Sequence, residues 1–218
     1  MDLTSDIQKL KRNYLPEDFK VTDWASLEPY FKELLERDTD SVEKLESWLR
    51  DMSELEAVVG EDLAWRQIRM TCDTENKTLE EAFVFFMMEI QPKVQEYADK
   101  LNRKLIENPF VKELDSDKYF TYLRNVKKNI DLYREENVPL QAELNVMAQQ
   151  FGVISGKMTV DIKGQEYTLQ QASKFLEDHD RSLREEVYRK ISDRRLQDKE
   201  KLDELFTQLI AKRHQVAL

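Results

Sequence analysis

The sequence contains two histidines, His179 and His214, and a single cysteine, Cys72. These residue types commonly bind zinc or act in nucleophile–base pairs. A zinc site needs three or four ligands at an ordered spacing, such as two histidines one helical turn apart. Here the histidines lie far apart in the chain and no HExxH motif occurs. We therefore predict no metal ligand in this chain, and we assign Asp178, His179 and Asp180 to a charged turn between helices.

The remaining residues with chemical potential also favour structural roles. Cys72 falls on an amphipathic pattern with no histidine nearby, which indicates a small core residue. The Gly152-x-x-x-Gly156 spacing lacks the Lys-Ser/Thr of a nucleotide-binding loop, and we expect one of these glycines to end a helix in a left-handed cap. We assign Met87, Met88 and the nearby phenylalanines to the core. The sequence thus predicts no catalytic and no cofactor-binding residue, and no cofactor in this chain.

Composition and charge narrow the class of protein. Only 4 of the 218 residues are glycine and 5 are proline, which favours long helices. The formal net charge of −10 disfavours binding to nucleic acid, so we interpret Lys127–Lys128 and Arg194–Arg195 as solvated faces. The sequence has neither an 18-residue apolar run nor a signal-peptide pattern, which predicts a cytoplasmic protein without a membrane partner.

Helical periodicity covers most of the chain beyond the first 19 residues, which are polar and predicted to be extended. Gly60 is expected to separate two helices, Pro92 to bend or restart a helix, and Asn108–Pro109 to end one. The segment from Phe83 to Ile90 is apolar on nearly all sides and is expected to be the central core helix. The residues predicted to cap helix starts are Ser26, Ser41, Thr78, Ser116, Thr168, and either Asp180 or Ser182.

One stretch departs from the helical pattern. Met158–Ile162 alternates apolar and polar residues, as a half-buried strand does, and Lys163–Gly164 can reverse the chain. A second strand over Glu166–Leu169 can then return. We predict a mainly α protein, a multi-helix domain of long antiparallel helices with one small β-hairpin near residues 157–169.

The domain organisation follows from the absence of a flexible linker. We expect residues 1–218 to form a single helical domain, with a subdivision conceivable near residues 108–109. The chain ends at Ala217–Leu218 within the apolar pattern of its last helix, and we expect an exposed apolar surface there.

The chain also carries many short sequence words that resemble one known family. It is similar over nearly its whole length to the N-terminal region of oligoendopeptidase F-type zinc metallopeptidases, which are relatives of thimet oligopeptidase. The words that carry the resemblance include Asp23–Trp24, Leu27–Phe31, Leu45–Leu49, Ser53–Glu56, Ala64–Trp65, Cys72–Thr74, Met158–Val160, Tyr167–Ala172, Asp180–Arg181, Arg184–Glu186, Leu202–Phe206 and Arg213–Ala217.

The resemblance implies a scaffold. In this family a helical N-terminal region forms one wall of a channel that admits short peptides, while HExxH and a downstream glutamate hold zinc in the C-terminal part. No residue here matches that motif, so the resemblance implies that the zinc belongs to the parent protein, that the catalytic domain is missing, and that this chain alone is inactive. The partners implied are short peptide substrates through the parent protein and the missing domain, with self-association through the last helix as a further expectation. The alternative is a stand-alone helical module that binds a partner protein.

Overall fold

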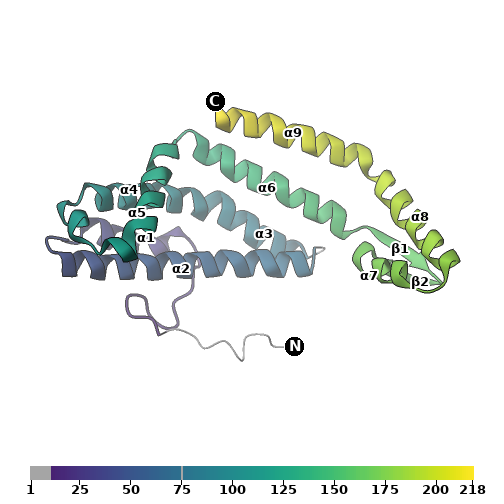
Figure 1. The fold of residues 1–218 in the computed structure, drawn as a ribbon, viewed down its shortest axis with the longest axis horizontal. Helices are drawn as coiled ribbons and strands as arrows, with labels where there is room; N and C mark the ends of the chain where they lie inside the picture. The colour runs from purple at the N-terminus through teal and green to yellow at the C-terminus, as the bar shows by residue number, and fades with distance from the viewer. Residues whose placement is uncertain (1–10, 75) are drawn as a thin grey trace. The chain divides into compact units, whose positions relative to one another are not determined.

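The computed structural model describes residues 11–74 and 76–218, and most of them are helical (Figure 1). The described residues divide into two compact units. Unit 1 takes in the described residues up to Arg66 and then Glu89–Glu135, and unit 2 takes in Gln67–Met88 and Glu136–Leu218. Asn108–Pro109 lies inside unit 1, and the assignment of residues 1–218 to one domain stays a prediction. The predicted extended segment lies outside the described residues over residues 1–10.

Unit 1 is built on α1 (Trp24–Glu36), α2 (Val42–Cys72, which continues into unit 2), α4 (Gln91–Glu107) and α5 (Ser116–Leu132), with a 3-10 turn η2 (Pro109–Glu113). The rings of Trp24 and Phe31 on α1 pack with Tyr97 on α4, at centroid separations of 5.0 and 5.7 Å. The buried Trp48 indole on α2 donates to the carbonyl of Leu34 on α1 at 2.8 Å. Aromatic packing and this buried hydrogen bond together fix α1 against its neighbours.

The C-terminal end of α1 is held by a lysine from α4. Lys104 Nζ donates to the carbonyl oxygens of Leu34, Leu35 and Arg37 and lies 5.6 Å from the Trp48 ring centroid. The last carbonyls of a helix lack partners within the helix, and a cation there satisfies them and complements the helix dipole. Burial and the nearby Arg37 lower the pKa of Lys104 from its usual value.

The segment before α1 is attached to unit 1 by one carboxylate. Glu54 on α2 accepts hydrogen bonds from the backbone N–H groups of Asn13, Tyr14 and Leu15, at 2.8, 3.0 and 2.8 Å. The Tyr14 hydroxyl donates to Glu33 Oε2 on α1 at 2.8 Å. Three consecutive amides directed at one carboxylate form a compact anion-binding arrangement, and they hold this segment in place.

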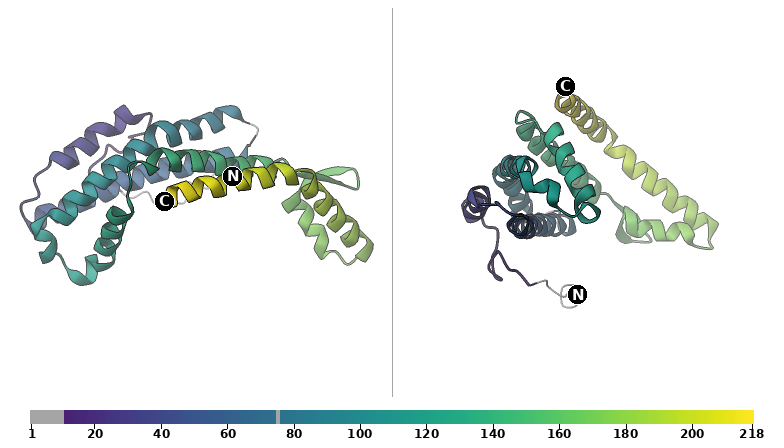
Figure 2. Two further views of the ribbon diagram at one scale, coloured as in Figure 1. Left: turned by 90° about the horizontal axis from the view of Figure 1, so that it is seen from above. Right: turned by 60° about the vertical axis from the view of Figure 1, so that its left-hand side comes forward.

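Unit 2 contains α3 (Lys77–Phe85), α6 (Asn137–Gly156), strands β1 (Thr159–Ile162) and β2 (Gln165–Thr168), α7 (Leu169–Ser173), η3 (Lys174–Glu177), α8 (Arg181–Gln197) and α9 (Lys199–Ala217). Helices α6 and α9 run antiparallel beside each other (Figures 1 and 2). The start of α6 meets the end of α9, where Asn137 Nδ2 donates to the Val216 carbonyl at 2.9 Å and Lys212 pairs with Glu143. This pair confirms the predicted long antiparallel helices.

The predicted hairpin is confirmed. β1 and β2 pair antiparallel with Ile162 opposite Gln165, and the two-residue turn between them has φ 55° at Lys163 and φ 81° at Gly164. Two left-handed residues in sequence define the turn whose twist matches a hairpin. Helices α7 and α8 lie beside the hairpin at one end of unit 2 (Figure 1). Their buried side chains complete a small hydrophobic core with it. Its buried members are Met158, Val160, Ile162, Leu169, Ala172, Leu183, Val187 and Ile191.

Several helix boundaries differ from the predictions. Ser41, Thr168 and Asp180 do precede helices as predicted. Three other starts are capped earlier, because a preceding Asp or Asn side chain reaches the free amides first: Asp23 replaces Ser26, Asn76 replaces Thr78, and Asp115 replaces Ser116.

The interior breaks differ as well. Gly60 does not separate two helices, since α2 passes through it as one helix of 31 residues. Pro92 restarts the helix as predicted, following a π-helical turn η1 (Phe86–Ile90). The segment from Phe83 to Ile90 is not buried on nearly all sides, as a central core helix would be. It is buried on one face only, because Phe85 and Met88 are 42% and 43% exposed while Phe86 and Met87 are buried. No helix in the described parts of the chain is both long and apolar enough to cross a bilayer.

Candidate functional site

The charged turn before α8 has a structural role. Asp180 caps α8 through the Ser182 N–H at 2.9 Å, and the Asp178 carboxylate accepts from the Asp180 N–H at the same distance. Arg184 donates to the carbonyl of Asp178 at 2.6 Å. His179 is exposed within this turn. The predicted charged turn between helices is therefore confirmed.

The other histidine does not come together with potential ligands. His214 is exposed near the end of α9. Among residues 11–74 and 76–218, no three His, Cys, Asp or Glu side chains lie close enough together to hold a metal ion. The described residues therefore do not fit a zinc site, which needs at least three protein ligands.

Two structural expectations for this group of residues are wrong. Cys72 is exposed at the end of α2 and is not a core residue, because the buried side of this last turn is the one that carries Met70. Neither Gly152 nor Gly156 forms a left-handed cap, since both lie within α6 and its C-cap, Lys157, has φ −83°.

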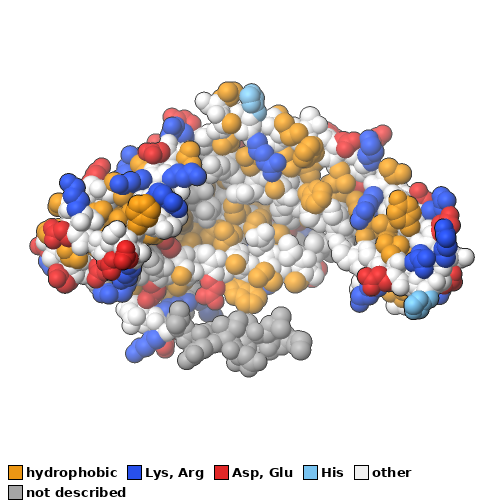
Figure 3. All heavy atoms as spheres, in the orientation of Figure 1, with side chains coloured by type: hydrophobic (Ala, Val, Ile, Leu, Met, Phe, Trp, Pro, Cys, Tyr) orange, Lys and Arg blue, Asp and Glu red, His pale blue; other side chains and the backbone are white. Residues whose placement is uncertain are grey.

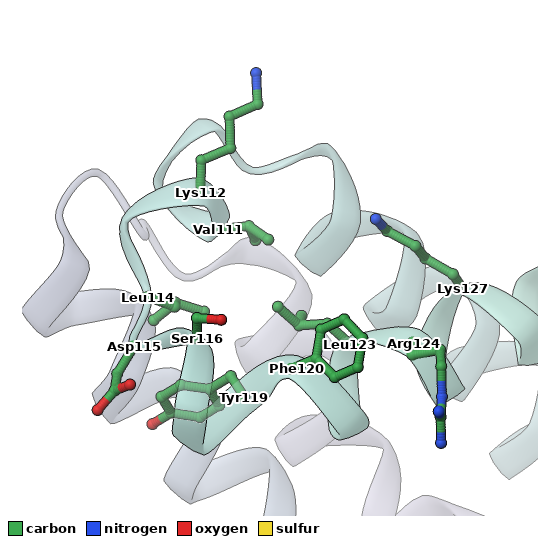
Figure 4. Close-up of a pocket in the computed structure, with 10 residues that line it drawn as sticks. All are labelled: Val111, Lys112, Leu114, Asp115, Ser116, Tyr119, Phe120, Leu123, Arg124 and Lys127. Atoms are coloured by element: carbon green, nitrogen blue, oxygen red, sulfur yellow. The ribbon is translucent and has the colours of Figure 1, made fainter.

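The structure does bring together a set of side chains that the sequence prediction missed. An open hollow of about 330 Å³ lies in unit 1 where η2 meets α5 (Figure 4). Its apolar floor comes from Val111 on η2, Leu114 in the connection, and Phe120 and Leu123 on α5. Phe120 is 63% exposed. Val126 is the residue of α5 that is buried.

The charge around this hollow is positive. Three of its ten lining residues are cations, Lys112, Arg124 and Lys127, and one is an acid, Asp115. The Asp115 carboxylate already accepts the Asp117 N–H at 2.9 Å as the cap of α5. Lys127 extends toward η2, whereas Lys112 points away from the hollow (Figure 4). We refer to Val111, Leu114, Phe120, Leu123, Arg124 and Lys127 as the α5 hollow.

The α5 hollow has a signal in the sequence. Phe120, Arg124 and Lys127 follow the i, i+4, i+7 spacing that places residues on one face of a helix. An aromatic residue followed by two cations on the same helix face could have indicated a binding surface there. The prediction instead treated Lys127–Lys128 only as a solvated pair.

A second hollow of about 540 Å³ lies on α4 beside the end of α1. Its cations are already engaged, since Lys100 pairs with Glu96, Arg103 pairs with Asp99, and Lys104 donates to the α1 carbonyls. Groups with satisfied partners have less to gain from a ligand. The α5 hollow is therefore the better candidate for a binding site.

Comparison with solved structures shows a shared fold. A Bacillus anthracis protein described as an oligoendopeptidase F aligns over 95% of this chain and 39% of its own, with a TM-score of 0.83 and 23% identity. A second structure described as an oligoendopeptidase F aligns over 91% of this chain and 35% of its own, with the same score and identity. PZ peptidase A with inhibitor 2 aligns over 92% and 36%, with a TM-score of 0.82 and 20% identity. The chain thus spans well under half the length of these proteins.

Sequence comparison identifies the family. No curated protein sequence matches the chain. The family model described as the Peptidase M3 N-terminal domain matches residues 15–133, which is more than half of the chain. The chain therefore belongs to the Peptidase M3 N-terminal domain family.

Proposed function

We propose that this chain is the helical N-terminal scaffold of a zinc-dependent oligopeptidase, and that it forms part of the wall of a channel for short peptides. The observation that carries this proposal is the family match over residues 15–133. The two solved structures described as oligoendopeptidase F support it, because they share this fold over at least 91% of the chain.

The proposed role of the chain is structural. Zinc in a metallopeptidase acts as a Lewis acid and activates a water molecule. The described residues offer no ligand set for such an ion. We therefore assign zinc and catalysis to the remainder of a longer polypeptide, and to this chain the support of the channel and the exclusion of folded proteins. We further propose a cytoplasmic location. We also propose that the chain has no nucleic-acid partner, in keeping with the net charge of −10.

Helix α9 has exposed apolar side chains that could contact a partner protein. Leu205 and Leu209 on α9 are buried, whereas Phe206 and Ile210 are 59% and 51% exposed. Apolar side chains are also visible between charged ones along α6 and α9 (Figure 3). Exposed apolar surface of this kind commonly marks a protein interface. We propose that the catalytic part covers it in a longer polypeptide, and that copies of the 218-residue chain associate through it.

A peptidase assay tests the proposed function. The chain and the longer polypeptide encoded by the same gene are each incubated with a quenched fluorescent peptide, with and without a zinc chelator. We expect chelator-sensitive cleavage by the longer polypeptide and none by the chain alone. Zinc-dependent cleavage by the chain alone would refute the scaffold role.

The sequence of the gene beyond codon 218 separates this function from the alternative, a stand-alone interaction module. An HExxH motif downstream supports the peptidase. A stop codon directly after Leu218 supports the module, for which the exposed side chains of α9 would be the docking face.

A further inference from the structure

The lining of the α5 hollow holds more cations than acids. Several cations of unit 1 form ion pairs, as Arg37 does with Glu33 and Asp51, and Arg66 does with Asp62. Arg124 and Lys127 form no ion pair with any residue that the structure describes. In a chain of net charge −10, two such cations on one helix face create a local site for an anion.

The hollow is also apolar where the cations meet it. The guanidinium carbon of Arg124 lies 6.0 Å from the centroid of the Phe120 ring, at the outer limit of a cation–π contact. Leu123 and Val111 are half-buried beside this ring, and Leu114 is buried. An ion that is polar on every side would leave these apolar groups without a partner. The lining therefore matches a ligand that is apolar at one end and anionic at the other.

The dimensions restrict the ligand further. A volume of about 330 Å³ lies at the small end of the range for ligand pockets, about 300–1,000 Å³. It can take a large side chain and a carboxylate beside it. An extended backbone of several residues would have to leave the hollow.

We propose that the α5 hollow binds the C-terminal end of a peptide whose last residue is aromatic or large and aliphatic. The terminal carboxylate pairs with Lys127, whose side chain extends toward η2, and the last side chain packs against Phe120 and Leu123 (Figure 4). The Arg124 side chain points away from Lys127 and adds positive charge beside the hollow. A lysine ammonium binds a carboxylate as a compact point charge with three hydrogen-bond donors. This inference rests on the proposed function for its choice of a peptide as the ligand.

Binding can be tested on the 218-residue chain itself by following backbone amide signals in NMR titrations. The probes are acetyl-Ala-Phe with a free carboxylate, the same dipeptide as its C-terminal amide, and acetyl-Ala-Ala with a free carboxylate. We expect the acid form of acetyl-Ala-Phe to shift the signals of η2 and α5. Because exposed ion pairs are individually weak, we expect the amide to bind only about five-fold less tightly. The alanine peptide should bind more weakly than the phenylalanine peptide.

Variants assign the contacts. Lys127→Gln and Arg124→Gln should each reduce the preference for the acid over the amide, and Phe120→Ala should reduce the preference for phenylalanine over alanine. Lys128→Gln is the matched control, because Lys128 is an equally exposed neighbour that does not line the hollow. All these side chains are exposed, so circular dichroism should show an unchanged fold.

Two results would overturn the proposal: equal binding of the acid and the amide, or shifts confined to elements other than η2 and α5. The readout is independent of peptidase activity. A longer polypeptide without that activity would refute the proposed function, while acid-selective binding at η2 and α5 would still establish the site.

Discussion

At the scale of single residues, Glu54 illustrates how one carboxylate can position a segment that has no secondary structure of its own. Burial raises the pKa of Glu54. The amides of Leu15, Asn13 and Tyr14, together with Arg12, lower it by more than burial raises it, so the pKa lies below the ordinary value of 4.5. The charged form is therefore the one that the folded protein binds best. Attachment of residues 13–15 to α2 depends on this charge.

We predict that acid releases this segment before the helices unfold. A carboxyl group whose pKa is lower in the folded state contributes fully above its unfolded value, here 4.5, and loses that contribution as the pH falls through the folded value. The protection factors of the Asn13, Tyr14 and Leu15 amides, which are exchange rates relative to the intrinsic rate at the same pH, should therefore fall below about pH 4.5. Glu54→Gln should show fast exchange already at neutral pH, while Glu36→Gln, an exposed control on α1, should not. Slow exchange in Glu54→Gln at pH 7 would contradict this account.

At the scale of elements, two glycines have opposite requirements. Gly164 has φ 81° in the hairpin turn, a backbone conformation in which an L-side chain is strained. Gly60 lies in the middle of α2, and an added Cβ there would meet nothing within 4 Å.

We therefore predict substitutions of opposite sign. Gly164→Ala should lower the free energy of unfolding by about 1–2 kcal/mol, because a left-handed conformation disfavours alanine. Gly60→Ala should raise it by about 0.5–1 kcal/mol, since alanine loses less entropy in a helix. Urea denaturation of both variants beside the parent chain measures the difference. Stabilisation by Gly164→Ala would mean that the turn does not need its positive φ.

These elements also show what the sequence could and could not predict. The hairpin was predictable because alternation and a two-residue turn are both local signals. Gly60 misled the prediction because glycine weakens a helix by only about 1 kcal/mol, which the packing of its neighbours can exceed. The caps at Asp23, Asn76 and Asp115 were missed because several polar residues compete within one turn, and only backbone geometry decides between them.

The α5 hollow was missed for a different reason. Whether Phe120 faces the core or solvent depends on where the partner helices lie, and periodicity alone does not give that. The exposed apolar side chains of α9 were predictable only in part, since Leu205 and Phe206 are adjacent in sequence yet differ in burial. Burial is a property of tertiary packing.

At the scale of the whole molecule, the outer face of α9 has a measurable consequence. Phe206 and Ile210 lie one turn apart on this face, and their exposure favours association of the chain with a second copy. We predict that Phe206→Glu with Ile210→Glu raises the dissociation constant for self-association at least about ten-fold, because burying carboxylates is costly. Sedimentation over a range of concentrations provides the measurement.

The control for this prediction lies on the neighbouring helix. Tyr188 and Leu196 on α8 are 65% and 63% exposed, so Tyr188→Glu with Leu196→Glu adds the same charge at two apolar side chains that are also largely exposed. This pair should leave association unchanged. A strictly monomeric parent chain that binds no apolar dye would count against the α9 face as an interface.

The exposure of Cys72 has a practical consequence. It is the only cysteine among 218 residues, and it lies at the surface at the end of α2. A maleimide fluorophore should therefore attach at one position in the native chain without any mutation. Such a singly labelled molecule would report tumbling rates by fluorescence anisotropy, so that association could be followed at nanomolar concentrations.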